Sequence, residues 1–323
     1  MTIMPFICLG IGFFVGVKNR SIWVLGMVDQ VINVVLVILM LTIGLNIGIN
    51  DSVMSNLGVI GLNCVIISCS GILLSVACVF VLEETVLPLQ QIKEEIMREK
   101  LSAGVEEAER ADSKEEKKPS PLIVIMPVSI VAGVALGYFL FSKEGSFSIA
   151  PYLDWSLLGS LVLLYTGVGI SLGTNRSVFR FVKRIGFKLL LLPLGIFVGS
   201  LGAGVLTGLI LGIPQEFSLM SAGGMSYYSV TGAYMTNAYG IEAGTYGFMV
   251  NVMREFFTVV FLPLLIRISK GSPIAAGAAG GMDTMLMPIT RLVGPELGLV
   301  TLITGSILTI VVPILLPIVH GLL

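Results

Sequence analysis

Long apolar runs recur along nearly the whole of this 323-residue chain. Each run is long enough to cross the hydrocarbon core of a bilayer, roughly 30 Å thick, as a single helix. Hydrophobic residues form 55% of the sequence and charged residues only 12%, a balance that excludes an ordinary water-soluble domain. The pattern predicts an all-α polytopic membrane protein with about eight transmembrane helices. The predicted spans are residues 5–17, 31–49, 57–82, 122–141, 155–172, 187–211, 246–266 and 297–319.

Basic residues gather in alternate connections between these spans, and the opposite connections hold only Lys143. The sequence predicts a protein of the cell inner membrane. By the positive-inside rule, its basic connections face the cytoplasm and both chain termini lie on the opposite, outer side. We expect the first span to be retained, because it lacks the basic start and cleavage site of a signal peptide. The formal net charge of −1 gives no reason to expect a nucleic-acid partner. The cytoplasmic connections contain Lys18, Arg20, the basic residues of 93–118 and 176–184, Arg267 and Lys270.

A charged segment divides the chain into related parts. Residues 83–120 read as a solvated cytoplasmic linker, between a first three-helix unit at 1–82 and a second at 121–212. The sequence GLNIGIN at 44–50 corresponds to GISLGTN at 169–175. Because each unit has an odd number of spans, the second copy must be inverted, as in many secondary transporters.

A second repeat lies in residues 213–323, where AGGMS at 222–226 matches AGGMD at 279–283. Both copies are rich in glycine and polar residues, so we interpret them as re-entrant hairpins or broken helices. Each copy precedes one apolar span, which gives two hairpin-plus-helix units forming a transport core. The alternative, in which both segments cross fully, gives ten spans and conflicts with the charge rule for Arg267 and Lys270.

Asp51 and Asp283 are the main candidates for a cation site. A carboxylate in or near hydrocarbon is costly and usually has a partner or a task. Each could hold a proton, a sodium ion or an ammonium group, and competition between these cations is a physical basis for exchange. The plain alternative for Asp51 is an interfacial residue or helix N-cap. The sequence contains no metal-binding motif, and we expect no proton relay from His320, the only histidine.

Further candidates lie in the same regions. Arg254 and Glu255 stand inside the seventh span, where Arg254 is expected to neutralise an aspartate and Glu255 to meet a substrate ammonium, unless both form a structural ion-pair network. Backbone N–H groups of the hairpins could receive a substrate carboxylate. The polar hairpin side chains could instead serve packing. The remaining candidates for substrate or cation binding are Asn46, Asn50, Gly223, Gly224, Ser226, Tyr227, Tyr228, Gly280 and Gly281.

Several segments resemble the LysO-type lysine exporters of bacteria and archaea. They are GLNIGIND with the following SNL, the charged linker, GMSYYSVTG, the RE pair followed by FLPLLIR, and GGMDTMLMPITR. The resemblance implies export of L-lysine and its toxic analogues, with Asp51 and Asp283 required for exchange against protons. The family is also distantly similar in fold to cation-proton antiporters and bile-acid symporters.

The expected function is thus secondary active export of L-lysine, and of analogues such as thialysine, in exchange for protons or sodium. Alternatives are a sodium-coupled transporter of a small organic anion or a cation/proton antiporter. An enzyme is not expected, since HExxH and GxSxG are absent, and the missing GxxxxGK[ST] motif argues against ATP as driving force. No cofactor is expected beyond the coupling ion. L-lysine and the lipid bilayer are the expected partners, and a homodimer is one option for the assembly.

Overall fold

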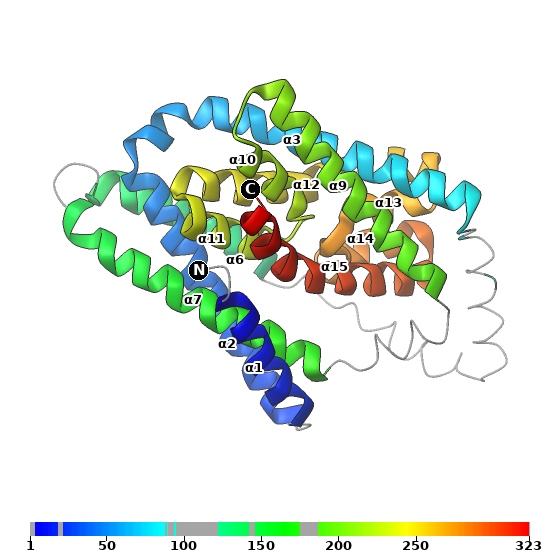
Figure 1. The fold of residues 1–323 in the computed structure, drawn as a ribbon, viewed down its shortest axis with the longest axis horizontal. Coiled ribbons are helices and arrows are strands. Elements are labelled where there is room, and N and C mark those ends of the chain that lie inside the picture. Colours follow the sequence, from blue (N-terminus) through cyan, green and yellow to red (C-terminus); the bar gives the residue numbers. More distant parts are fainter. Residues whose placement is uncertain are drawn as a thin grey trace.

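The computed structural model describes residues 4–18, 22–87, 89, 94, 122–141, 146–174 and 187–322. Throughout these residues the regular structure is helical (Figure 1). The first half contains α1 (Met4–Lys18), α2 (Ile22–Ile49), α3 (Asp51–Thr85), α6 (Leu122–Leu136) with the π-helical turn η1 (Gly137–Phe141), and α7 (Ser146–Thr174). The second half contains η2 (Phe187–Leu190), α9 (Leu191–Leu211), α10 (Gln215–Gly223), α11 (Tyr228–Tyr239), α12 (Ile241–Ile268), α13 (Gly271–Gly277), η3 (Ala278–Met282), α14 (Leu286–Val293) and α15 (Pro295–Leu322).

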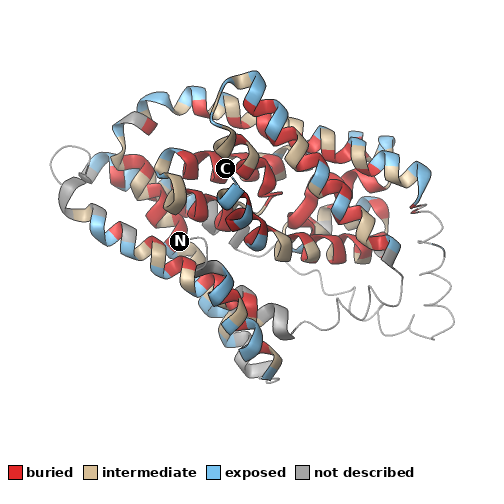
Figure 2. Ribbon diagram, viewed as in Figure 1, coloured by how far each residue is buried: buried red, intermediate tan, exposed pale blue. Residues whose placement is uncertain are grey.

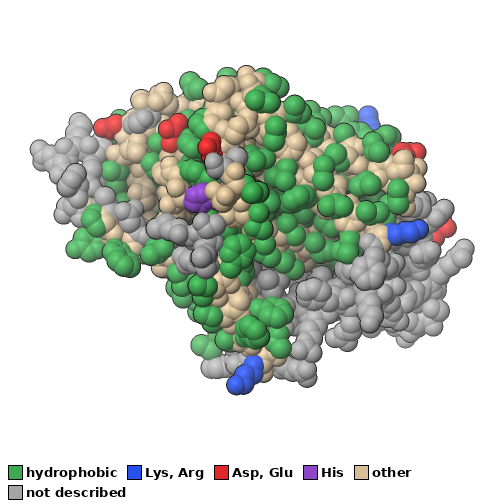
Figure 3. Space-filling model, viewed as in Figure 1, with side chains coloured by type: hydrophobic (Ala, Val, Ile, Leu, Met, Phe, Trp, Pro, Cys, Tyr) green, Lys and Arg blue, Asp and Glu red, His purple; other side chains and the backbone are tan. Residues whose placement is uncertain are grey.

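Five of these helices are long and apolar enough to cross a membrane. Their apolar segments are Gln30–Ile49, Val53–Thr85, Lys188–Leu211, Ile241–Ile268 and Glu296–Leu322. Large apolar side chains also cover much of the outer surface, such as Phe139 at 80% exposure and Ile210 at 76% (Figure 3). Such a surface suits lipid rather than water. The chain is therefore a multi-pass helical membrane protein, while the prediction of eight spans remains a prediction.

The helices form two groups (Figure 1). In one, α1 packs along α7 and α2 packs along α6. These contacts are close because glycines lie at the interfaces: a Cβ on Gly12 would come within 2.2 Å of the Thr166 carbonyl oxygen, and one on Gly44 within 2.4 Å of the Ile130 oxygen. The other group comprises α3 and α9 to α15, and it holds most of the buried residues (Figure 2).

Two hairpins of broken helices lie inside the second group. α10 runs back along α9, and α11 follows after a break. α12 then runs back along α11, so that Thr236 of α11 meets Gly244 near the start of α12. Beyond α12, α13 starts beside the end of α3, and after η3 the helix α14 returns along α15, where Thr290 meets Gly298. Each hairpin thus ends on the side of the molecule where it began. Both segments are therefore broken helices, and their re-entry into the membrane remains a prediction.

Several helices extend beyond the predicted spans. α2 begins at Ile22, nine residues before the predicted span at 31–49, although its apolar segment, Gln30–Ile49, agrees with that span. α3 runs from Asp51 to Thr85, beyond the predicted 57–82 at both ends. Glu83, predicted to lie in the linker, belongs to α3, and its Oε2 accepts a hydrogen bond from the Gly271 N–H (3.0 Å) at the start of α13. A carboxylate at a helix N-terminus is favourable. The rest of the predicted linker, except Glu84 to Leu87, Leu89 and Glu94, lies outside the described residues.

Candidate functional site

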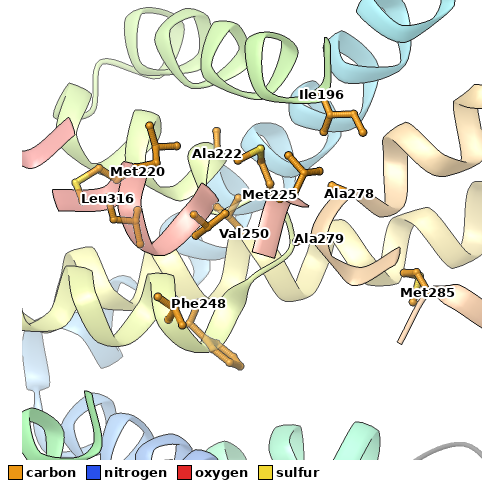
Figure 4. Close-up of a cluster of buried hydrophobic side chains, with 14 of the residues drawn as sticks. Ile196, Met220, Ala222, Met225, Phe248, Val250, Ala278, Ala279, Met285 and Leu316 are labelled. Carbon is orange, nitrogen blue, oxygen red and sulfur yellow. The ribbon is translucent and has the colours of Figure 1, made fainter. Parts of the chain in front are cut away.

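The two helix breaks meet at one point inside the protein. The Ala279 N–H in η3 donates a hydrogen bond to the Met225 carbonyl oxygen (3.0 Å) in the break between α10 and α11. Met225, Ser226 and Ala278 have positive φ angles of 46°, 73° and 47°, a conformation that is unfavourable for residues with a Cβ. Apolar side chains from α9, α12 and α15 enclose the crossing (Figure 4). The crossing joins the two copies of the AGGM repeat, which are far apart in the sequence.

Asn251 on α12 holds the first break in place. Its Nδ2 donates to the carbonyl oxygens of Ser221 (2.9 Å) and Gly247 (2.7 Å), and its Oδ1 accepts from the Ser226 N–H (2.7 Å). The side chain is fully buried. Gly224 is needed here, because a Cβ at that position would lie 2.4 Å from Asn251 Nδ2. Asn251 therefore supplies hydrogen bonds that the interrupted helix cannot make for itself.

Glu255 and Asp283 form a pair of carboxyl groups at the second break. The Thr284 hydroxyl donates to Glu255 Oε1 (3.0 Å), while the Thr284 N–H donates to Asp283 Oδ1. The two carboxylates also interact electrostatically with each other. Glu255 is half-buried and Asp283 is exposed. A Cβ on Gly280 would lie 2.9 Å from Glu255 Oε1, so glycine lets this carboxylate approach the backbone.

Other residues predicted from sequence lie in the same two broken segments. Tyr228 interacts electrostatically with both Glu255 and Asp283, and Tyr227 interacts with Asp283. Ser226 is buried, and its hydroxyl has no hydrogen-bond partner among the residues that the structure describes. Gly223 and Gly281 are buried in the same two broken segments. These groups bring hydroxyls and two acids together, a set of ligands suited to an ammonium group or a hard cation.

Arg254 has a different role from the one predicted. Its guanidinium is 1% exposed and donates to Ser200 Oγ (2.8 Å), Ser75 Oγ (3.1 Å) and the carbonyl oxygens of Ala275 and Ala276 (both 3.2 Å). None of these acceptors is a carboxylate, so the expected neutralisation of Asp283 or Asp51 is not found. The two carbonyls belong to the last turn of α13, where a positive charge is favourable. Arg254 therefore braces α3, α9 and α13 against α12.

The structure does not bring Asp51 to the site. Asp51 is exposed in the first turn of α3, and the stretch of helix from Asp51 to Gly71 is about 30 Å long. Gly71 lies beside Arg254, with 3.5 Å between its ideal Cβ and Nη1. Asn50 is the N-cap of α3, with its Oδ1 accepting from the Val53 N–H (3.0 Å), and Asn46 is half-buried near the end of α2. These three residues form a separate polar group.

Helix ends complete the site. α11 begins at the first break and α14 at the second, and their N-cap residues, Tyr227 and Met285, make no side-chain capping hydrogen bond. The first N–H groups of such helices have no partner inside the helix and carry partial positive charge. The crossing thus presents negative side chains and positive helix ends within one region. An amino acid, which carries both charges, has the matching chemistry.

Sequence reasoning missed Asn251 and Thr284. Asn251 stands three residues before Arg254 in an apolar span, and an amide at that depth needs hydrogen-bond partners, which was a usable signal. Thr284 follows Asp283 directly, but only the folded break shows that its hydroxyl reaches Glu255.

Comparison with known proteins shows relatives along much of the chain. The family model described as "Lysine exporter LysO" matches residues 128–320. A "Lysine exporter LysO" of Escherichia coli (strain K12) is 26% identical over 207 residues, covering 64% of this chain and 69% of that protein. A "Putative lysine exporter" of Haemophilus influenzae is 25% identical over 194 residues, covering 58% of this chain and 93% of its own. No solved structure matches.

Proposed function

The chain belongs to the lysine exporter LysO family, and from this membership we propose that it exports L-lysine across the membrane in exchange for an inward-moving cation. The observation that carries the proposal is the carboxyl pair of Glu255 and Asp283 at the crossing of two broken helices. The family is one of transporters, not of enzymes. The function rests on binding and release at this site.

Lysine fits the site by charge. In the proposed complex an ammonium group of lysine lies between Glu255 and Asp283, with the Thr284 and Tyr228 hydroxyls beside it. In the proposed complex the lysine carboxylate lies near the N-terminus of α11, where the helix dipole carries partial positive charge. Thialysine has the same two ammonium groups and carboxylate, so it is accepted too. A proton or a sodium ion on the carboxylates removes the charge that holds lysine and releases it.

Alternating access is supported by the helix contacts. α1 packs on α7 as α6 packs on α2, α3 packs on α9, and α10 packs on α9 as α13 packs on α3. These pairings are those expected if the units α1–α3 and α6–α9 are inverted copies, each followed by a hairpin and a helix. In the proposed orientation, both termini lie outside and the ends of α3 and α12 face the cytoplasm. Asp51 is proposed as a second cation-binding residue near the outer end of α3.

Flux measurements on proteoliposomes test the function. Vesicles loaded with radiolabelled lysine are diluted into buffer with an inward gradient of protons or of sodium, and lysine release is followed. Asp283→Asn and Glu255→Gln are each expected to slow gradient-driven release at least about tenfold, because a neutral amide cannot exchange cations. Glu84→Gln is the matched control, because Glu84 is an exposed acid at the end of α3.

The results of these flux measurements distinguish lysine exchange from sodium-coupled anion transport. Faster lysine release under one inward cation gradient supports exchange and identifies the coupling ion. Wild-type rates in Asp283→Asn and Glu255→Gln would remove the site from the mechanism. Accumulation of an organic anion with sodium, without lysine movement, would replace lysine export altogether.

A further inference from the structure

Ser226 carries a buried polar group directly before a helix N-terminus. Its side chain is 3% exposed, and its hydroxyl has no hydrogen-bond partner within the described part of the chain. α11 begins two residues later at Tyr228, and its N-cap residue, Tyr227, makes no side-chain capping hydrogen bond. Chain connectivity keeps the Cα atoms of Ser226 and Tyr228 at most about 7 Å apart. The hydroxyl and the first N–H groups of α11 can therefore share one ligand.

The backbone at Ser226 shows that this hydroxyl is costly to keep. The Tyr227 N–H donates to the Gly224 carbonyl oxygen (2.7 Å), which closes a β-turn with Met225 and Ser226 as its central residues. Both central residues have positive φ angles, a conformation that favours glycine or asparagine. A glycine at position 226 would adopt it more easily and would bury no unpaired hydroxyl. Buried hydroxyls nearly always bond to protein or to an ordered water, so this one marks a place for a polar ligand.

The charge at this place selects an anion. The first N–H groups of α11 have no partner inside the helix, and they carry the partial positive charge of the helix N-terminus. Such a terminus attracts carboxylate and phosphate groups and disfavours a sodium ion. The Ser226 hydroxyl adds a donor of the same kind. The only anionic group of lysine is its carboxylate, which is the ligand that this end of the site suits.

The distance from this place to the carboxyl pair corresponds to the length of lysine. The Tyr228 ring, on the first residue of α11, packs edge-on against Phe248 of α12, with 5.6 Å between the ring centroids. Phe248 and Glu255 are seven residues apart, so they share one face of α12 and lie about 10 Å apart along it. An extended lysine has about 7 Å between its carboxylate carbon and Nζ, and a hydrogen bond of about 3 Å at one end completes the span.

The contact between the two breaks gives a similar distance. Met225, the residue before Ser226, accepts the hydrogen bond of the Ala279 N–H (3.0 Å). Asp283 follows Ala279 by four residues at the end of η3, which is about 8 Å at the rise of a 3-10 helix. Ser226 and Asp283 therefore lie at opposite ends of a space of lysine length.

We propose that the Ser226 hydroxyl and the N-terminus of α11 bind the α-carboxylate of the substrate, and that this contact restricts transport to diamino acids and excludes diamines of the same length. The inference rests on the proposed lysine export and narrows its substrate class. The diamine 1,5-diaminopentane keeps both ammonium groups of lysine but has no carboxylate. It leaves the buried hydroxyl unpaired, and a site built to hydrogen-bond a substrate group strongly rejects an analogue that lacks the group.

Displacement of radiolabelled lysine from the purified protein tests this inference, with unlabelled lysine, lysinamide and 1,5-diaminopentane as competitors. In the wild-type protein we expect the two competitors without a carboxylate to bind at least about a hundredfold more weakly than lysine. Ser226→Ala keeps the Cβ and hence the turn. It should weaken lysine about tenfold and leave the other two within about twofold. Ser218→Ala is the control, because Ser218 is a buried serine of the same hairpin whose hydroxyl donates to the Gln215 carbonyl oxygen (3.4 Å).

Three results would overturn the assignment. Equal displacement by lysine and 1,5-diaminopentane in the wild-type protein would show that no carboxylate is bound, and this comparison needs no variant to fold. Unchanged lysine affinity in Ser226→Ala would leave the hydroxyl with a water molecule only. Equal weakening of all three competitors would make Ser226 part of the scaffold. Each of these results leaves lysine export standing, whereas a wild-type protein that neither binds nor moves lysine would contradict the proposed function itself.

Discussion

Arg254 shows how a single charged residue can be kept inside an apolar helix bundle without a carboxylate partner. Its guanidinium has four acceptors on three neighbouring helices, and arginine presents its donors in a fixed planar fork that lysine lacks. Arg254→Lys should leave at least one of the four acceptors without this donor, because an ammonium group has three N–H donors, and it should lower stability by about 2–4 kcal/mol. Thermal melting of the detergent-solubilised protein measures this.

The control is Arg267→Lys on the exposed end of the same helix, which should change stability by less than about 0.5 kcal/mol. Equal melting temperatures for the two variants would show that Arg254 is not a brace.

Asn251 makes the corresponding prediction for the first break. Asn251→Ala removes three hydrogen bonds and leaves the Ser226 N–H and the Ser221 carbonyl without their side-chain partner. The expected cost is about 2–3 kcal/mol, with loss of lysine transport because the break supports the site. Asn237→Ala, on the half-buried end of α11, serves as the comparison. Normal transport by Asn251→Ala in vesicles would contradict this role.

At the level of helices, the glycines on α1 offer a matched pair of substitutions. A Cβ at Gly12 would meet the Thr166 oxygen at 2.2 Å, whereas a Cβ at Gly10 has nothing within 4 Å. Gly12→Ala must therefore push α1 away from α7, at a cost of about 1–3 kcal/mol. Gly10→Ala should be neutral or slightly stabilising, since alanine favours helix. Thermal melting compares the two, and equal stability would mean that the contact between α1 and α7 is not close-packed.

The sequence was informative about helices for a clear physical reason. Apolar length predicts a membrane helix because backbone groups in lipid must bond within the helix, and a glycine-rich, polar segment such as AGGMD predicts a break for the same reason. The ends of helices were less predictable than the apolar spans: α2 starts at Ile22, although the polar residues Asp29 and Gln30 lie within it.

Pairing between residues was the least predictable part of the site. Asp283 was found from sequence because a carboxylate in an apolar segment is costly, and Glu255 for the same reason. Glu255, and not Asp51, lies with Asp283 at the second break. This pairing depends on which ends of α3 and α12 lie side by side, and one sequence does not contain that information. Arg254 braces neighbouring helices while Glu255, adjacent in the chain, faces Asp283, because adjacent residues of a helix point in different directions.

The molecule as a whole has a defined sidedness that can be tested by thiol labelling. The ends of α3 and α12 share one side, because Glu83 binds the Gly271 N–H just after α12, while the end of α15 lies with α11 on the other, because His320 bonds to Tyr234. Basic residues on the α12 end predict that this side is cytoplasmic. In a variant whose four native cysteines are replaced by alanine, a membrane-impermeant maleimide should label Leu322→Cys in intact cells and Arg267→Cys only after permeabilisation. Labelling of Arg267→Cys in intact cells, with Leu322→Cys protected, would reverse the orientation, and the end of α15 would then face the cytoplasm.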